Sequence, residues 1–232
     1  MTINSCEDLE RTVQDTGILP FFKNNVKGFS IEEMTPDSLW FADDADGPWE
    51  WKGPVIREGN CAYGKLFRGK AGYVSLGLYP DFVNMRRANF KMSTKEKDIY
   101  QLIVDNDSLL SKEVKKLGGF RRCKTVKTDN PIDRLIKSPR CGKRKTEGFD
   151  TIMTRLQMHC YIVIADFEYQ YTHDGKRYGW GIARYTTPEA LFGVEDIQCK
   201  RSPEESRDFI IQSVAEKRPD LAKEQLLKLI EG

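Results

Sequence analysis

Gln157, His159 and Asp166 come closest in this sequence to a catalytic arrangement, at the point where an apolar helical pattern passes into a strand pattern. If the helix ends by Leu156, Gln157 and His159 share one face, because side chains alternate along an extended chain. A neutral imidazole near pH 7 is then a capable general base. The alternative is a structural His159 that bonds to the backbone or faces solvent, and His173, in a THDG turn, is expected to be exposed.

A basic segment in the middle of the chain is the main charge feature. The chain carries a net charge of +2, but residues 1–60 hold 5 basic and 12 acidic side chains (net −7) and residues 112–145 hold 13 and 3 (net +10). Such a local field attracts polyanions, including nucleic acid. The alternatives are a solvated basic loop without a partner, or a segment neutralised by the acidic N-terminal part of the same chain.

Local patterns predict the elements that must position these residues. Helices are expected at residues 5–15, 30–34, 35–41, 78–90, 95–107, 108–119, 149–156, 202–217 and 219–231, and one more begins at Pro48. Strands are expected at residues 60–67, 71–77, 160–171 and 177–186. Pro54 is expected to limit the helix that begins at Pro48, and residues 17–30 are expected to form a loop.

Three helices followed by a β-hairpin are typical of a winged helix-turn-helix domain. Both hairpins have a Gly-Lys turn, RGK and DGK, which suggests an internal repeat. The sequence therefore predicts an α+β fold of tandem winged helix-turn-helix-like units, mostly helical with β-hairpin wings. The predicted units are an N-terminal winged-helix-like unit at 1–92, a winged-helix domain at 93–195 with a basic insertion at 120–148, and a C-terminal helical tail at 196–232.

A winged helix predicts which residues touch nucleic acid. Its third helix enters the major groove, while the wing and loops contact phosphates. Bases are expected to meet Thr151, Thr154 and Arg155. Phosphates are expected to meet Lys176 and Arg177 at the wing tip, Arg121, Arg122, Lys143, Arg144 and Lys145 in the insertion, and Arg86 and Arg87 beside it. For Arg86 and Arg87, an ion pair with the acidic N-terminal segment is the alternative.

Several other classes of site lack the residues they need. Six cysteines without a CxxC pair, together with two histidines, form no recognisable metal set, so reduced thiols, no metal and no cofactor are expected. GKRKT at 142–146 lacks the earlier glycine and the preceding strand of a P-loop. No apolar stretch approaches the ~20 residues of a membrane span and no signal peptide is evident, so a cytoplasmic protein without a membrane partner is expected.

Four stretches carry a family resemblance that covers roughly residues 5–195: PWEWKGPVIREGNCAYGKLF, KAGYVSLGLYPDFVNMRR, FDTIMTRLQM and KRYGWGIARYTTPE. They resemble a bacterial group related to the AlkZ-like winged-helix DNA glycosylases. The resemblance implies a tandem winged-helix architecture, a cytoplasmic bacterial origin and a DNA-associated ancestry. Active members of the parent family carry a Gln-x-Gln or Gln-x-Asp motif near the N-terminus, whose side chains position the attacking water.

That catalytic motif does not carry over to this sequence. The nearest N-terminal match is VQD, where Gln14 and Asp15 are adjacent and point about 100° apart on a helix. Binding of nucleic acid, most simply duplex DNA, is therefore the preferred function. A protein-interaction module without a nucleic-acid site and a divergent DNA glycosylase are the alternatives, and the oligomeric state is left open.

Overall fold

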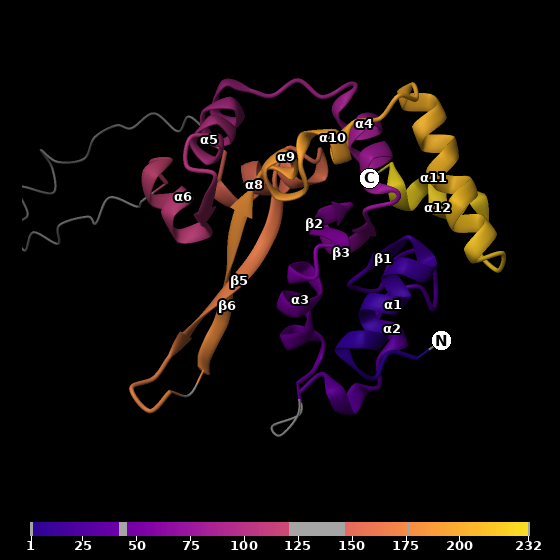
Figure 1. The fold of residues 1–232 in the computed structure, drawn as a ribbon, viewed down its shortest axis with the longest axis horizontal. Helices are drawn as coiled ribbons and strands as arrows, with labels where there is room; N and C mark the ends of the chain where they lie inside the picture. Colours follow the sequence, from indigo (N-terminus) through magenta and orange to yellow (C-terminus); the bar gives the residue numbers. More distant parts are fainter. Residues whose placement is uncertain (1, 42–45, 121–146, 176, 232) are drawn as a thin grey trace, which may run out of the picture.

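Two three-stranded antiparallel sheets organise the chain, one in each half, with helices around them (Figure 1). The computed structural model describes residues 2–41, 46–120, 147–175 and 177–231. Helices and small antiparallel sheets confirm the expected α+β class. Buried residues from both halves form one hydrophobic cluster, so the two sheets share a core. Within the described residues, no helix is both long enough and apolar enough to cross a membrane.

The first half contains the elements α1 to α4. Their bounds are α1 (Cys6–Thr16), β1 (Ile18–Pro20), α2 (Ile31–Met34), the 3₁₀ helix η1 (Asp37–Leu39), α3 (Pro48–Arg57), β2 (Cys61–Phe67), β3 (Lys70–Ser75) and α4 (Tyr79–Arg87). The Ser5 side chain caps α1 by accepting the N–H of Asp8, and Gly17, at φ 81°, ends the helix. The strands are ordered β1-β3-β2, and the β2–β3 turn contains two residues of positive φ, Arg68 and Gly69.

The second half repeats this order. Its elements are α5 (Thr94–Val104), β4 (Ser108–Leu110), α6 (Ser111–Leu117), α8 (Phe149–Met158), β5 (Val163–Tyr171), β6 (Arg177–Thr186), α9 (Pro188–Phe192) and α10 (Val194–Ile197). The strands are ordered β4-β6-β5. In each half, therefore, a short strand follows the first long helix. This strand pairs with the second strand of a β-hairpin, and the hairpin itself follows a later helix, α3 in the first half and α8 in the second.

The hairpin of each half packs against the helix that precedes the hairpin of the other half. Strand β5 contacts α3, and the β5–β6 hairpin runs alongside α3 (Figure 1). In the reciprocal contact, β2 packs on α8, where the Nζ of Lys65 donates to the Oγ1 of Thr154 at 3.0 Å. An ion pair of 2.8 Å between Arg57 and Asp166 joins α3 to β5. The two halves therefore interlock.

Two further helices, α11 (Pro203–Lys217) and α12 (Lys223–Ile230), complete the fold. Ser202 and Glu205 form a capping box at the start of α11. Helix α11 packs on α4, where the amide of Asn84 donates to the hydroxyl of Ser206 at 2.9 Å. Four apolar side chains at this end of the chain are buried: Leu221, Leu226, Leu229 and Ile230.

Four local predictions were wrong. Strand β1 lies in the expected loop and β4 occupies the start of an expected helix, because three residues are too few to show a strand periodicity. Helix α3 continues past Pro54 to Arg57, since the burial of Val55 and Ile56 offsets the one hydrogen bond that the proline removes. Helix α8 continues past Leu156 to Met158, which changes the relation between Gln157 and His159.

Candidate nucleic-acid interface

The predicted base-reading face of α8 is mostly engaged within the protein. Thr151 is exposed at the start of the helix. Thr154 is half-buried against β2, where it accepts the hydrogen bond from Lys65. The Nε of Arg155 lies 2.6 Å from the carboxylate of the buried Glu96, and its guanidinium also pairs with Glu147. Of the three side chains, Thr151 is the one positioned to meet an external partner without breaking a contact.

Arg86 and Arg87 also have internal partners. Arg86 is buried and its Nη2 donates to the carbonyl oxygen of Leu66 at 3.0 Å. Arg87 donates to both carboxylate oxygens of Glu189 and to the carbonyl oxygen of Cys160. The ion pair of Arg87 is thus formed with the second half of the chain and not with the acidic N-terminal segment. Both arginines tie α4 to neighbouring elements.

The remaining predicted phosphate contacts fall outside the described residues or side chains. They are Arg121, Arg122, Lys143, Arg144, Lys145, Lys176 and the side chain of Arg177. By sequence, residues 121–146 carry 10 basic and 2 acidic side chains. The described residues on either side of this segment lie together, because the rings of Phe120 and Phe149 are 5.3 Å apart between centroids. The two ends to which the basic segment is attached are therefore close together in the fold.

Lysines surround the site where residues 121–146 attach to the fold. The Nζ of Lys115 lies 5.6 Å from the centroid of the Phe149 ring, and the Nζ of Lys95 lies 5.1 Å from that of Phe120. Such cation–π contacts hold the amines near the surface without neutralising them. Lys112 and Lys116 are exposed on the same helix, α6, as Lys115. Helix α6 therefore presents several cations beside the attachment of residues 121–146.

The turn of the β2–β3 hairpin supplies a second group of cations. Arg68 and Lys70 are exposed there, and the Nζ of Lys70 donates to the carbonyl oxygen of Lys23 at 3.1 Å. Arg68, Lys70 and Lys23 border a surface depression of about 470 Å³. A Cβ placed on Gly69 would lie 3.4 Å from the Cγ2 of Thr154, so the turn reaches α8.

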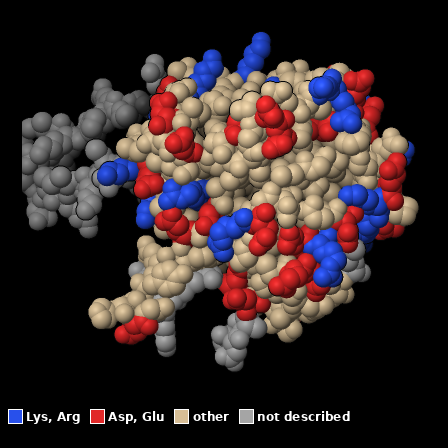
Figure 2. Space-filling model, in the orientation of Figure 1, with Lys and Arg blue, Asp and Glu red and all other residues tan. Residues whose placement is uncertain are grey.

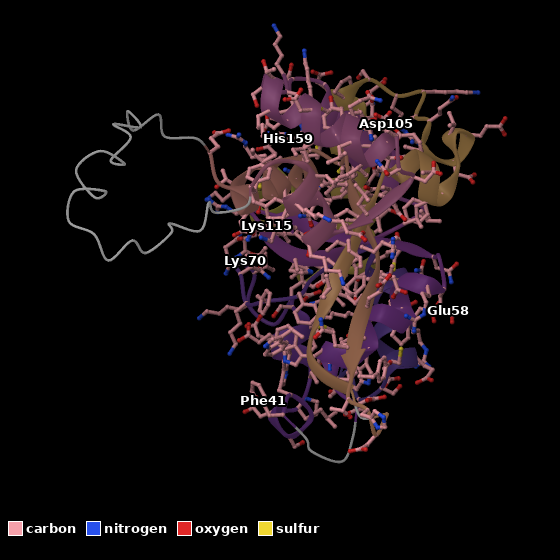
Figure 3. All side chains as sticks on the ribbon, turned by 90° about the vertical axis from the view of Figure 1, so that its left-hand side faces the viewer. Phe41, Glu58, Lys70, Asp105, Lys115 and His159 are labelled. Atoms are coloured by element: carbon pink, nitrogen blue, oxygen red, sulfur yellow. The ribbon has the colours of Figure 1, made fainter. Side chains whose placement is uncertain are left out.

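We call these two groups the basic edge, and it consists of Lys23, Arg68, Lys70, Lys112, Lys115 and Lys116. In the view of Figure 3 the labels of Lys70 and Lys115 fall on the left side of the molecule, whereas those of Glu58 and Asp105 fall toward the right. Basic and acidic side chains are intermixed on the face shown in Figure 2. The sequence interpretation used RGK only as a turn signal, although its two cations were the clue to this surface.

Gln157 is a buried structural link between α8 and β2. Its side chain is 1% exposed. The Oε1 accepts the backbone N–H of Lys65 at 3.1 Å, and the Nε2 donates to the carbonyl oxygen of Met153 at 2.9 Å. A hydrogen bond also joins it to Tyr185, whose pKa is raised to about 12, chiefly by burial. Both ends of the amide are thus already occupied.

His159 belongs to a different environment. It caps the C-terminus of α8, its Nδ1 lies 3.0 Å from the carbonyl oxygen of Arg86, and its ring stacks on Phe90 at 3.8 Å between centroids. Burial lowers the pKa of His159 from 6.5, which favours the neutral ring. Asp166 pairs with Arg57 on another element. The structure does not bring His159 and Asp166 together with the buried amide of α8.

The N-terminal Gln14 is also tied to the fold, since its Nε2 donates to the carbonyl oxygen of Asn60 at 3.1 Å, while the neighbouring Asp15 is exposed. Over the described parts of the chain, no three His, Cys, Asp or Glu side chains gather as metal ligands would.

Comparison with known proteins bears on the whole chain. Neither the curated proteins nor the solved structures give a match. A family model described as AlkZ related matches residues 3–231. This chain belongs to the AlkZ-related family.

Proposed function

We propose that the protein binds nucleic acid, preferentially duplex DNA, by contacting phosphates with the basic edge and the basic segment that attaches beside it. The basic edge carries the proposal: among the described residues, Arg68, Lys70 and Lys115 form no ion pair with a carboxylate. Exposed cations grouped in this way attract a polyanion. Membership of the AlkZ-related family supports a DNA-associated role, since the AlkZ-like proteins are DNA glycosylases.

We further propose that the two halves are winged-helix-like units at 1–92 and 93–195, the latter with its basic insertion at 120–148 and followed by a helical tail at 196–232. The support is their common order of elements and strands. In this assignment α3 and α8 take the place of recognition helices. Because each is packed against the hairpin of the other unit, binding proceeds by phosphate contacts along the edge, with Thr151 as the exposed residue of α8.

This mode of binding has a defined salt signature. Each cation that neutralises a phosphate of duplex DNA releases counterions and adds about −0.9 to the slope of log K against log salt concentration. Contacts to phosphates carry little sequence information. Affinity is therefore expected to fall steeply with salt and to vary little with DNA sequence.

Fluorescence anisotropy with duplex, single-stranded and abasic-site DNA at several salt concentrations tests the proposal. Replacing Arg68 and Lys70 by Gln should weaken binding to duplexes of any sequence and reduce the steepness of the salt slope by about 1–2. The matched control replaces Lys200 and Lys223, both exposed, by Gln. Lys200 precedes α11 by three residues and Lys223 begins α12, and Figure 1 shows these two helices on the opposite side from α6.

Two outcomes would overturn the proposal. One is the absence of salt-sensitive binding to every form of DNA, which would favour a protein-interaction module. The other is an equal loss of affinity for DNA in the edge variant and in the control variant. In that case the affinity would depend on the total charge of the protein and not on the position of the cations. Release of a base from alkylated DNA that is lost in His159→Ala but not in the edge variants would instead identify a divergent glycosylase.

A further inference from the structure

A second surface feature lies where α4, α8 and α11 end or begin beside the C-terminal end of the chain. It is a cavity of about 280 Å³. Its walls are made by Arg86, Asn89, Phe90, His159, Arg207 and, at the rim, Glu204 and Glu231. It is separate from the basic edge, whose residues do not line it.

A buried cation with few partners lines this cavity. Arg86 is 7% exposed, and its Nη2 donates to the carbonyl oxygen of Leu66. Within the described parts of the chain no carboxylate lies within ion-pair distance of its guanidinium, and Glu231 acts on it from farther away. A buried charge that is left without a close counterion destabilises a fold by several kcal/mol. An anion bound in the cavity would supply that counterion.

The other walls suit the same kind of ligand. Asn89, two residues beyond the end of α4, and Arg207 of α11 line the cavity from different elements, so donors approach it from several directions. The guanidinium of Arg207 also pairs with Asp208 and Glu231. His159 donates its Nδ1–H to the carbonyl oxygen of Arg86, so the Nε2 of the neutral ring is an acceptor for the O–H of a hydrogenphosphate. Several donors from different elements match the tetrahedral oxygens of a phosphate better than the two coplanar oxygens of a carboxylate.

We infer that this cavity is a phosphate-binding site centred on Arg86. Two sources of that chemistry fit the cavity: free inorganic phosphate, or the terminal phosphate of a nucleic-acid strand. The rim carboxylates oppose the anion, although Glu231 lies 3.8 Å from Arg207 and is partly offset by it. The exposed Glu204 therefore acts as a selectivity element that weakens anion binding, and its removal should strengthen it.

Isothermal titration of the full chain with sodium phosphate, against sodium chloride at matched ionic strength, tests this inference. Arg86→Gln should weaken phosphate binding about 10- to 100-fold, the change expected for loss of a charge-assisted hydrogen bond. Glu204→Gln should strengthen binding about two- to fivefold, as expected for removal of one exposed repulsive charge. The matched control is Lys91→Gln, which removes an exposed cation close to the cavity that does not line it and should change nothing.

A rim variant keeps the inference testable if Arg86→Gln does not fold. His159→Gln should weaken phosphate binding with the thermal unfolding transition retained. Parallel titrations with 5′-phosphorylated and 5′-hydroxyl oligonucleotides identify the source: competition by the phosphorylated form alone indicates a strand terminus, and competition by neither indicates the free ion. The edge variant with Arg68 and Lys70 replaced should still bind inorganic phosphate, which separates this site from the proposed DNA surface.

The inference is overturned if phosphate gives no more heat or stabilisation than chloride. It is also overturned if Arg86→Gln and His159→Gln, both folded, bind phosphate as tightly as the wild-type chain, or if Glu204→Gln weakens binding.

Discussion

Replacing Gln157 by Leu separates a structural role for this residue from a catalytic one. Leucine has nearly the same volume, so the change removes hydrogen bonds without opening a large cavity. The backbone N–H of Lys65 loses its acceptor at 3.1 Å, and the hydroxyl of Tyr185 loses its partner. The carbonyl oxygen of Met153 loses a donor too.

The size of the effect follows from these lost contacts. An unsatisfied buried donor destabilises a protein by about 1–3 kcal/mol. Two such groups are left, while burial of the leucine returns about 1 kcal/mol or somewhat more. The expected net loss is about 2 kcal/mol, which for a chain of this size corresponds to a fall in Tm of roughly 4–8 °C.

Urea and thermal unfolding of Gln157→Leu, compared with Gln225→Leu on the surface of α12, measure this difference. The surface variant should remain within about 0.5 kcal/mol of the wild-type chain, because its side chain is exposed. DNA binding well below the Tm should be unchanged in both variants. A Gln157→Leu protein as stable as the surface control would refute the structural reasoning. An undiminished stability with altered activity on DNA would point to catalysis.

Three other properties follow from burial and pairing. Burial raises the pKa of Cys61 to about 12 and that of Cys160 to about 11. Mass-spectrometric mapping should therefore find both thiols unmodified by iodoacetamide in the native protein at about pH 8 and alkylated in urea; rapid native labelling would contradict this. Because burial lowers the pKa of His159 from 6.5, the unfolded chain binds more protons below that pH. Stability should then fall as the pH drops from about 7 to 5, and His159→Gln should show a smaller fall in denaturant titrations across that range. Arg57 and Asp166 are 54% and 32% exposed, so a double-mutant cycle should give a coupling of about 0.2–1 kcal/mol despite their 2.8 Å contact. A coupling well above this would show that the pair is shielded from water.

Local signals predicted most of the elements because their causes are local. The Ser5 cap, the glycine that ends α1 and the capping box at Ser202 act within a few residues, and all are formed in the structure. The strands β1 and β4 escaped prediction because each consists of three residues and exists only by pairing with a distant hairpin strand. Their pairing depends on long-range contacts that a local pattern does not contain.

The candidate site was harder to predict for the same reason. Arginine is a residue type that commonly contacts phosphates, so Arg87 and Arg155 were predicted to do so. Their carboxylate partners, Glu189 and Glu96, are far away in the sequence. The basic edge was not predicted from the sequence, for a different reason. Arg68 and Lys70 are only two residues in a turn signal, and their position beside α8 becomes visible only when the two halves are packed together.

The interlocked hairpins also constrain how the chain folds as it is synthesised. Helix α3 is synthesised early, yet the strand that packs against it, β5, is translated much later. Until that strand emerges, Trp49 lacks its contacts with Trp180 and with the hydroxyl of Tyr169. The first half therefore leaves the ribosome without its contacts to the second hairpin, and it becomes fully stable only when the second half has been synthesised. Expression of the first half alone should consequently yield a less soluble product than the whole chain.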